Sequence, residues 1–194
     1  LMVSIWAFRL TFFLMKRGRN QPEDRRYQVI RQNNAPNFGF KSLYLIFIFQ
    51  GFIAWIISTI FVPVFDAGAS VETARTWNLW HSAGVALWLF GLIFESVADN
   101  QLHAFNQRVV KDCKTLNTGL WRYCRHPNYF GEITLWFGLT LLALPVLSGW
   151  QMITLISPLF VYLLLTKVSG IPLLDRAAAQ KWGSDADYLA YTKA

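Results

Sequence analysis

The sequence predicts an all-α, multi-pass transmembrane helical bundle with four to five membrane segments. Of its 194 residues, 54% are hydrophobic and only 15% are charged, whereas soluble domains have roughly 45–50% apolar and about 25% charged residues. The apolar residues form long runs, and most charged residues lie between these runs. This composition excludes an ordinary soluble domain, and the length favours a single membrane domain over residues 1–194.

Five apolar segments can be drawn along the chain, at 1–15, 42–65, 79–97, 129–147 and 150–168. A helix needs about 20 apolar residues to cross roughly 30 Å of hydrocarbon. The second to fifth segments meet this requirement, and the first is expected to be truncated or interfacial. Because the chain opens with Leu1 inside an apolar run, we expect it to be missing upstream helices.

The charges of the loops predict the orientation. Seven Lys or Arg residues lie in 16–41, five in 98–128 and three in the tail 169–194, whereas 66–78 has one. Cytoplasmic loops of membrane proteins carry the excess of Lys and Arg, so we expect the three basic regions in the cytoplasm, in a bacterial inner membrane or the endoplasmic reticulum. The net charge of +7 is spread over several loops, which favours a bilayer as partner and argues against nucleic acid.

The stretch 119–132 is the most informative part of the sequence, because it sets polar and ionisable residues against the start of an apolar segment. Such groups are costly at the edge of a bilayer and usually bind something. Arg122 and Arg125 offer planar forks that fit phosphate oxygens, and Asn128 offers a donor and an acceptor. A helix that begins at Pro127 would also favour an anion. The residues predict a phosphate-bearing nucleotide on the cytoplasmic side.

A second interpretation of these residues stays open. Arg122 and Arg125 could extend to lipid headgroups, with Glu132 as their counter-ion. Glu95 lies one turn before Asp99 on one helical face, and it could join the nucleotide site or pair with an arginine. Gln50, on an apolar helix, is interpreted as the partner in an interhelical hydrogen bond, with a substrate contact as the alternative.

The two cysteines, Cys113 and Cys124, do not form a C-x-x-C pair. Neither a disulfide pattern nor a metal-binding pattern applies to them. We therefore expect no metal site and no chemical role for either thiol.

The stretch Gly119-Leu120-Trp121, followed by Arg125-His126-Pro127-Asn128-Tyr129-Phe130-Gly131-Glu132, resembles the signature of membrane proteins related to the steroid 5-alpha reductases. The likeness is greatest to a largely uncharacterised, mostly microbial branch. Three further segments resemble parts of the same family: Arg9 with Glu23-Asp24-Arg25-Arg26-Tyr27, Asp99-Asn100-Gln101-Leu102, and Ser169-Gly170-Ile171-Pro172-Leu173-Leu174-Asp175.

The resemblance implies a bundle that binds NADPH from the cytoplasm and reduces an activated carbon–carbon double bond of a lipophilic, steroid- or isoprenoid-like substrate. It implies a cofactor-binding loop and helix start at 98–132 and a cytoplasmic tail at 170–194. The cofactor contacts that it implies are Asp99, Arg122, Arg125, His126, Asn128, Tyr129, Glu132 and Asp175. The substrate-facing acid of the steroid reductases lies at or before the point where this sequence begins, so no catalytic residue is assigned.

Two other functions remain open from the sequence. The Arg-His-Pro run also resembles isoprenylcysteine methyltransferases, which bind S-adenosylmethionine and have spaced tyrosines in the tail, here Tyr188 and Tyr191. Asn128 and Glu132 favour the reductase pattern over this one. The absence of a matching acid is compatible with a third function, a lipid-binding membrane protein without catalysis.

Overall fold

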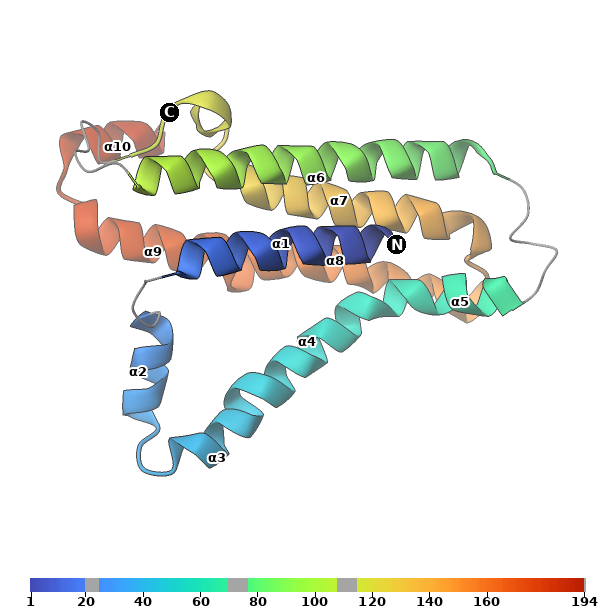
Figure 1. Cartoon of the computed structure of the whole chain (residues 1–194), viewed down its shortest axis with the longest axis horizontal. Helices are drawn as coiled ribbons and strands as arrows, with labels where there is room; N and C mark the ends of the chain where they lie inside the picture. Colours follow the sequence, from blue (N-terminus) through green and yellow to red (C-terminus); the bar gives the residue numbers. More distant parts are fainter. Residues whose placement is uncertain (20–24, 70–76, 108–114, 194) are drawn as a thin grey trace. The chain divides into compact units, whose positions relative to one another are not determined.

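The structure, a computed structural model, describes residues 1–19, 25–69, 77–107 and 115–193 (Figure 1). The described residues are 86% helical and contain no strand, which confirms the all-α prediction. Within these ranges, four helices are long and apolar enough to cross a membrane: Phe38–Asp66, Leu79–Asn106, Pro127–Val146 and Gly149–Trp182. The protein is therefore an integral membrane protein. The cytoplasmic assignment of its loops and the type of membrane stay predictions.

The described helices divide between two compact units, Leu1–Trp55 and Ile56–Ala194. The first unit contains α1 (Met2–Gly18), α2 (Arg25–Asn33), α3 (Phe38–Ser42), the π-helix η1 (Leu43–Ile48) and most of α4 (Phe49–Ser58). Within it, the Gln50 amide donates to the Tyr27 hydroxyl at 3.4 Å. This bond joins α4 to α2, so Gln50 makes an interhelical hydrogen bond, as we predicted. Glu23, Asp24 and Cys113, which were named above, lie outside the described residues.

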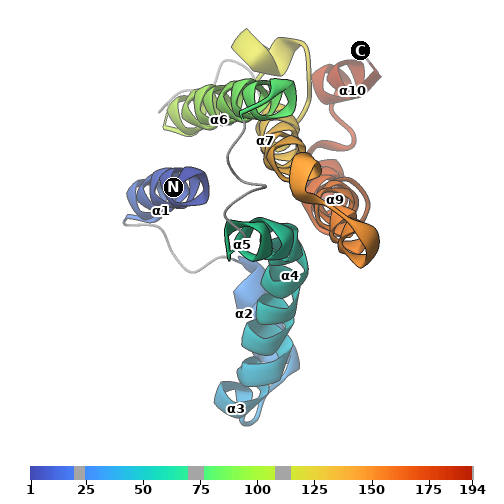
Figure 2. The ribbon, with the colours of Figure 1, turned by 90° about the vertical axis from the view of Figure 1, so that its right-hand side faces the viewer.

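The second unit contains the remaining helices and the whole candidate site. They are η2 (Thr59–Phe61), α5 (Val62–Ala69), α6 (Leu79–Asn106), η4 (Gly119–Arg122), α7 (Pro127–Ala143), η5 (Leu144–Val146), η6 (Gly149–Leu155), α8 (Ile156–Leu163), η7 (Leu164–Val168), α9 (Gly170–Trp182) and α10 (Ala186–Lys193). In Figures 1 and 2, α6 and α7 run side by side, with α8 and α9 along the next flank of α7.

Glycines allow the close approach of α6 and α7. A Cβ atom on Gly91 of α6 would lie 2.6 Å from the Leu135 backbone nitrogen, and one on Gly131 of α7 would lie 2.6 Å from the Glu95 backbone nitrogen. No side chain fits at these distances without moving a backbone. From Gly84 to Ala98 the buried positions of α6 recur at alternate spacings of four and three, as expected for one helix face packed along a partner; they are Gly84, Trp88, Gly91, Glu95 and Ala98.

Helix α6 continues nine residues beyond the end of the apolar segment at residue 97 and reaches Asn106. The apolar segment ends at residue 97 because polar residues follow it. Asp99 is nevertheless only 7% exposed and Phe105 only 8% exposed, because the helix packs against other parts of the unit here. Burial against protein, rather than against lipid, extends the helix.

The run Ser169-Gly170-Ile171-Pro172 predicts the end of the last membrane segment, and the helix changes there, since η7 ends at Val168 and α9 begins at Gly170. The helical run as a whole extends from Gly149 to Trp182. At the break, the Ser169 N–H donates to the Leu164 carbonyl at 2.8 Å. This i→i−5 hydrogen bond forms a π-turn that connects the two parts of the helical run. Pro172 then falls in the first turn of α9, where its missing N–H has no helical acceptor to lose.

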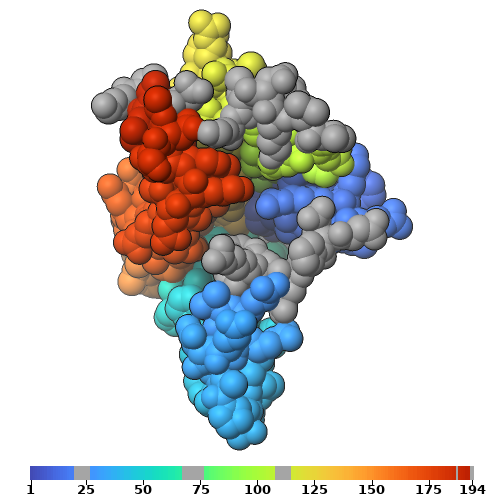
Figure 3. Space-filling view, turned by 90° about the vertical axis from the view of Figure 1, so that its left-hand side faces the viewer, coloured from blue at the N-terminus to red at the C-terminus, as the bar shows by residue number. Residues whose placement is uncertain are grey.

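The apolar residues of the tail predict one short amphipathic helix over 173–191, but the structure has two helices there. α9 ends at Trp182 and α10 begins at Ala186. Asp185 caps the second helix, because its carboxylate accepts from the Tyr188 backbone N–H at 3.1 Å. An aspartate at this position stabilises a helix start, so the chain turns at 183–185 and both helices reach the surface that Figure 3 shows in red.

Candidate functional site

The turn before α7 is tied to the end of α6. The Gln101 side-chain oxygen accepts from the Leu120 backbone N–H at 3.0 Å, and the Trp121 indole N–H donates to the Ala98 carbonyl at 3.1 Å. Gly119 has a φ of 61° and lies against the Gln101 amide, a position where a side chain would be strained and crowded. The turn is therefore held in one place relative to α6.

A small apolar cluster completes this anchor. Phe105, Leu116 and Trp121 are each 8% exposed and pack together, with Leu102 beside them. Burial of such side chains contributes about 1.5–3 kcal/mol for each large one. The cluster therefore holds the turn before α7 against the end of α6.

Helix α7 starts at Pro127, as predicted, with His126 as the residue before it. Proline suits this position because its φ is already helical and its missing N–H would have no helical partner. The His126 carbonyl accepts the first helical hydrogen bond, from the Phe130 N–H at 3.2 Å. This start places Arg125 and His126 immediately outside the helix, at its N-terminal end.

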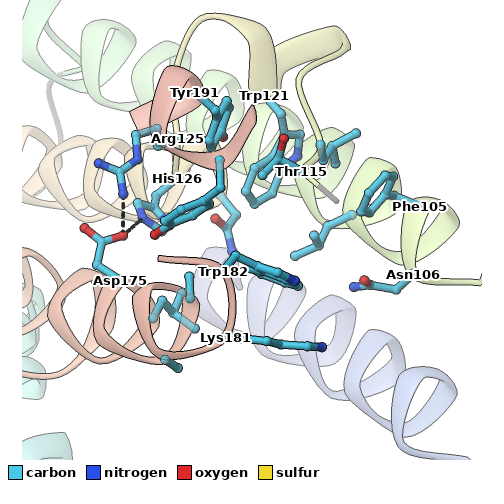
Figure 4. A pocket seen from close by; sticks show the side chains of 17 residues that line it. Phe105, Asn106, Thr115, Trp121, Arg125, His126, Asp175, Lys181, Trp182 and Tyr191 are labelled. Atoms are coloured by element: carbon cyan, nitrogen blue, oxygen red, sulfur yellow. Dashed lines mark hydrogen bonds and ion pairs between the residues drawn. The ribbon is translucent and has the colours of Figure 1, made fainter. Parts of the chain in front are cut away.

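Asp175 of α9 joins these two residues across 50 positions of sequence. Its Oδ1 atom accepts from Arg125 Nη2 at 2.6 Å and lies 3.3 Å from His126 Nε2. Figure 4 shows both interactions as dashed lines. The carboxylate is 36% exposed and the guanidinium 39% exposed, so this pair contributes little stability by itself. What it does is orient the arginine and the imidazole.

His126 is the most enclosed member of this group. Its side chain is 14% exposed, and its ring stacks on Tyr129 with 5.7 Å between centroids. Burial lowers the pKa of His126 below its ordinary value, although the hydrogen bond and charge of Asp175 act in the opposite direction. The imidazole therefore favours its neutral form. Burial likewise raises the pKa of the Tyr191 hydroxyl.

A cavity of about 370 Å³ opens beside this group. Its walls come from the end of α6, the turn, the start of α7, and the helices α9 and α10 (Figure 4). Five aromatic side chains line it: Phe105, Trp121, Trp182, Tyr188 and Tyr191. Its volume falls at the lower end of the roughly 300–1,000 Å³ that is typical of ligand pockets.

Four of the cofactor contacts that the resemblance implied line this cavity. They are Arg125, His126, Asn128 and Asp175. Tyr129 lies behind His126 and close to Gly170, where a Cβ would be 3.0 Å from the tyrosine ring. The ring thus supports the imidazole from the side of α9.

The other three implied contacts do not line the cavity. Asp99 is buried on α6, Arg122 is exposed at the end of η4, and Glu132 is half-buried on α7, one turn after Asn128. Glu95, the residue with two open interpretations, is 4% exposed and lies beside Gly131 in the contact between α6 and α7. Within the described ranges, no three His, Cys, Asp or Glu side chains could hold a metal ion, and Cys124 is a free, exposed thiol.

The sequence interpretation missed Lys181 as a lining residue and expected only packing from Trp182. The ammonium nitrogen of Lys181 lies 4.7 Å from the centroid of the Trp182 ring, and both side chains line the cavity. The available signal was a lysine next to an aromatic residue in the tail, six residues after the segment that resembles the family. Only the fold of the tail over the turn brings this pair to the site.

A family model described as "Protein of unknown function (DUF1295)" matches residues 1–194. No curated protein and no solved structure matches the chain.

Proposed function

Since the chain belongs to this family of proteins of unknown function, we propose a function from the site itself: a membrane-bound reductase that uses NADPH to reduce an activated carbon–carbon double bond of a lipophilic substrate. The observation that carries the proposal is the cavity, because it combines Arg125, His126 and Asn128 with aromatic walls at one end of helices that are long enough to cross a membrane.

The residues present fit a nicotinamide dinucleotide. Arg125 has five N–H donors, and its bond to Asp175 uses Nη2 alone, so donors remain for a phosphate. The aromatic rings offer faces for a planar base. The cavity's volume accommodates part of a dinucleotide, and the rest would extend beyond it.

Asn128 supplies the most specific support. Its Oδ1 atom is buried without a hydrogen-bond partner, and a buried unsatisfied acceptor costs about 1–3 kcal/mol. Since the side chain lines the cavity, its amide is placed to form a hydrogen bond with a polar group of a ligand there.

NADPH would supply the hydride for the β-carbon of an enone, and the protein would supply placement and a dry site. Arg125 and Lys181 would bind phosphate groups, and the buried rings of Trp121 and Tyr188 would exclude water. Asp175 would keep Arg125 and His126 in position through the bonds described above. The proton donor is not assigned to any residue.

A second candidate has one specific observation in its favour. Tyr188 and Tyr191, the spaced tyrosines of the methyltransferase interpretation, line the same cavity as Asp175. Aromatic faces and a carboxylate are groups that attract a sulfonium cation. S-adenosylmethionine is therefore the alternative ligand, and a lipid-binding protein without a nucleotide is the third outcome.

Ligand-dependent thermal unfolding of the protein in detergent separates these functions. A ligand at 100 times its Kd stabilises a native protein by about 2.7 kcal/mol, and we expect this effect from NADPH. Stabilisation by S-adenosylmethionine alone would establish the methyltransferase instead, and stabilisation by neither ligand would leave the lipid-binding protein.

Arg125→Gln tests whether the effect arises in this cavity. Loss of a charge-assisted hydrogen bond weakens binding by about tenfold to hundredfold, so the variant should need correspondingly more NADPH for the same shift. Arg176→Gln is the matched control, because Arg176 is exposed on the same helix as Asp175 and does not line the cavity. Equal NADPH affinity in the Arg125 variant and the wild type would show that NADPH binds outside this cavity.

A further inference from the structure

Lys181 is a cation of the cavity that carries its charge without a carboxylate partner in the described part of the chain. Its ammonium group lies over the Trp182 ring at 4.7 Å, and both ion pairs of the site instead involve Asp175, with Arg125 and His126. A lysine held on an aromatic face is a compact point charge suited to a phosphate. Its exposed ammonium group is available to an anionic group of a ligand in the cavity.

In Figure 4, Arg125 lies beside Tyr191 in the upper part of the view, and Lys181 lies below Trp182. Arg125 precedes α7 and is bound to Asp175, whereas Lys181 belongs to the last turn of α9. The same cavity is lined by Trp182, Tyr188 and Tyr191, and Trp182 and Tyr188 have their centroids 6.2 Å apart. A ligand that matches this arrangement has a planar ring system and two anionic groups.

The two halves of NADPH differ in this respect. The adenosine half carries phosphate at both its 2′ and 5′ positions, whereas the nicotinamide half carries phosphate only at its 5′ position. One ring system with two separate phosphates is therefore found in the adenosine half alone. NADH lacks the 2′-phosphate, so each of its two halves carries phosphate only at the 5′ position.

We propose that this cavity binds the adenosine 2′,5′-bisphosphate half of NADPH, with Lys181 on the 2′-phosphate, Arg125 on the 5′-phosphate and the rings of Trp182, Tyr188 and Tyr191 along the adenine. The proposal rests on the function proposed above and adds to it the residue that selects NADPH over NADH. Lys181 acts as a specificity-determining residue, and it takes no part in hydride transfer.

Equilibrium binding to the detergent-solubilised protein tests the assignment without any turnover. NADPH and NADH are titrated against the wild type, Lys181→Gln and Arg176→Gln. We expect the wild type to prefer NADPH by about tenfold to hundredfold, the worth of one charge-assisted contact. Lys181→Gln should bring this ratio close to one with NADH affinity unchanged, and Arg176→Gln, which removes a charge from the same helix outside the cavity, should keep it.

Two half-molecules then identify which end of the cofactor the cavity holds. Adenosine 2′,5′-bisphosphate should compete with NADPH in the wild type and lose affinity in Lys181→Gln, and nicotinamide mononucleotide should not compete. If Lys181→Gln keeps the preference for NADPH, or if only nicotinamide mononucleotide competes, this inference is overturned while the reductase proposal stands. If neither NADPH nor NADH binds the wild type, the proposed function itself fails. Lys181 is exposed, so the variant is expected to fold, and its melting temperature checks this.

Discussion

Gly131→Ala tests the close approach between α6 and α7 on which the position of the site depends. A Cβ at residue 131 would lie 2.6 Å from the Glu95 backbone nitrogen, 2.8 Å from its Cβ and 2.9 Å from its Cα. Carbon atoms pack best about 3.5–4.0 Å apart, so the helices must separate by about 1 Å at this point. Two of the three atoms are backbone, which cannot rotate away.

The net cost follows from two opposing effects. Overpacking of this kind costs about 1–3 kcal/mol, and the upper value applies because the opposing atoms are backbone. Alanine is better than glycine in a helix by about 1 kcal/mol. We therefore expect a net loss of about 2 kcal/mol in the free energy of unfolding. For a chain of this length, that loss lowers the melting temperature by about 4–8 °C.

Thermal unfolding in detergent, followed by the loss of helical circular dichroism, measures this difference. Gly51→Ala is the control, because Gly51 lies in an apolar helix and a Cβ added there would meet no atom within 4 Å. The control should melt at the wild-type temperature or slightly above it. A Gly131→Ala variant that melts as the control does would refute the close packing of α6 on α7.

Two further predictions concern the site. Because burial lowers the pKa of His126 from its ordinary 6.5, against the opposing effect of Asp175, the folded state binds this proton less tightly than the unfolded state. Stability should thus be full above pH 6.5 and fall as the pH drops from there towards the lowered pKa; a His126→Gln variant that shows the same fall between pH 8 and pH 5 would exclude His126 as its cause. Trp121→Phe removes the indole donor to the Ala98 carbonyl and should lower the free energy of unfolding by about 0.5–1.5 kcal/mol. Trp150→Phe, at a tryptophan that is 70% exposed, is the control, and equal melting temperatures for the two variants would contradict the anchoring role of Trp121.

The local features of this chain could be predicted from sequence because their causes are local. The membrane segments follow from runs of apolar residues, which must leave water wherever the chain goes. The start of α7 follows from the fixed φ of Pro127. Ser169 is a local break of this kind, because η7 ends and α9 begins there, although the helical run continues to Trp182. The apolar run of α6 stops at 97, and no local pattern shows that the helix continues to Asn106 with Asp99 and Phe105 buried by protein.

The composition of the site was decided by tertiary structure. The resemblance named Arg125 and Asp175 separately, but their ion pair joins residues 50 positions apart, and no local rule connects them. Asp99 and Glu132 belong to the same implied set, yet the cavity is lined by other residues, because each side chain's direction depends on which face of its helix packs against a neighbour. Lys181 entered the site only because the break between α9 and α10 brings Trp182 and the tail tyrosines together.

The sequence by itself therefore determined that this is a helical membrane protein with a polar, phosphate-compatible stretch before one of its spans. Hydrophobicity and helix capping depend on residues one to four positions apart, so they can be predicted from the sequence. Tertiary structure alone decided which groups share a cavity, because that depends on how closely α6 and α7 approach at glycines such as Gly91 and Gly131, and on where α9 and α10 fold back on the turn before α7.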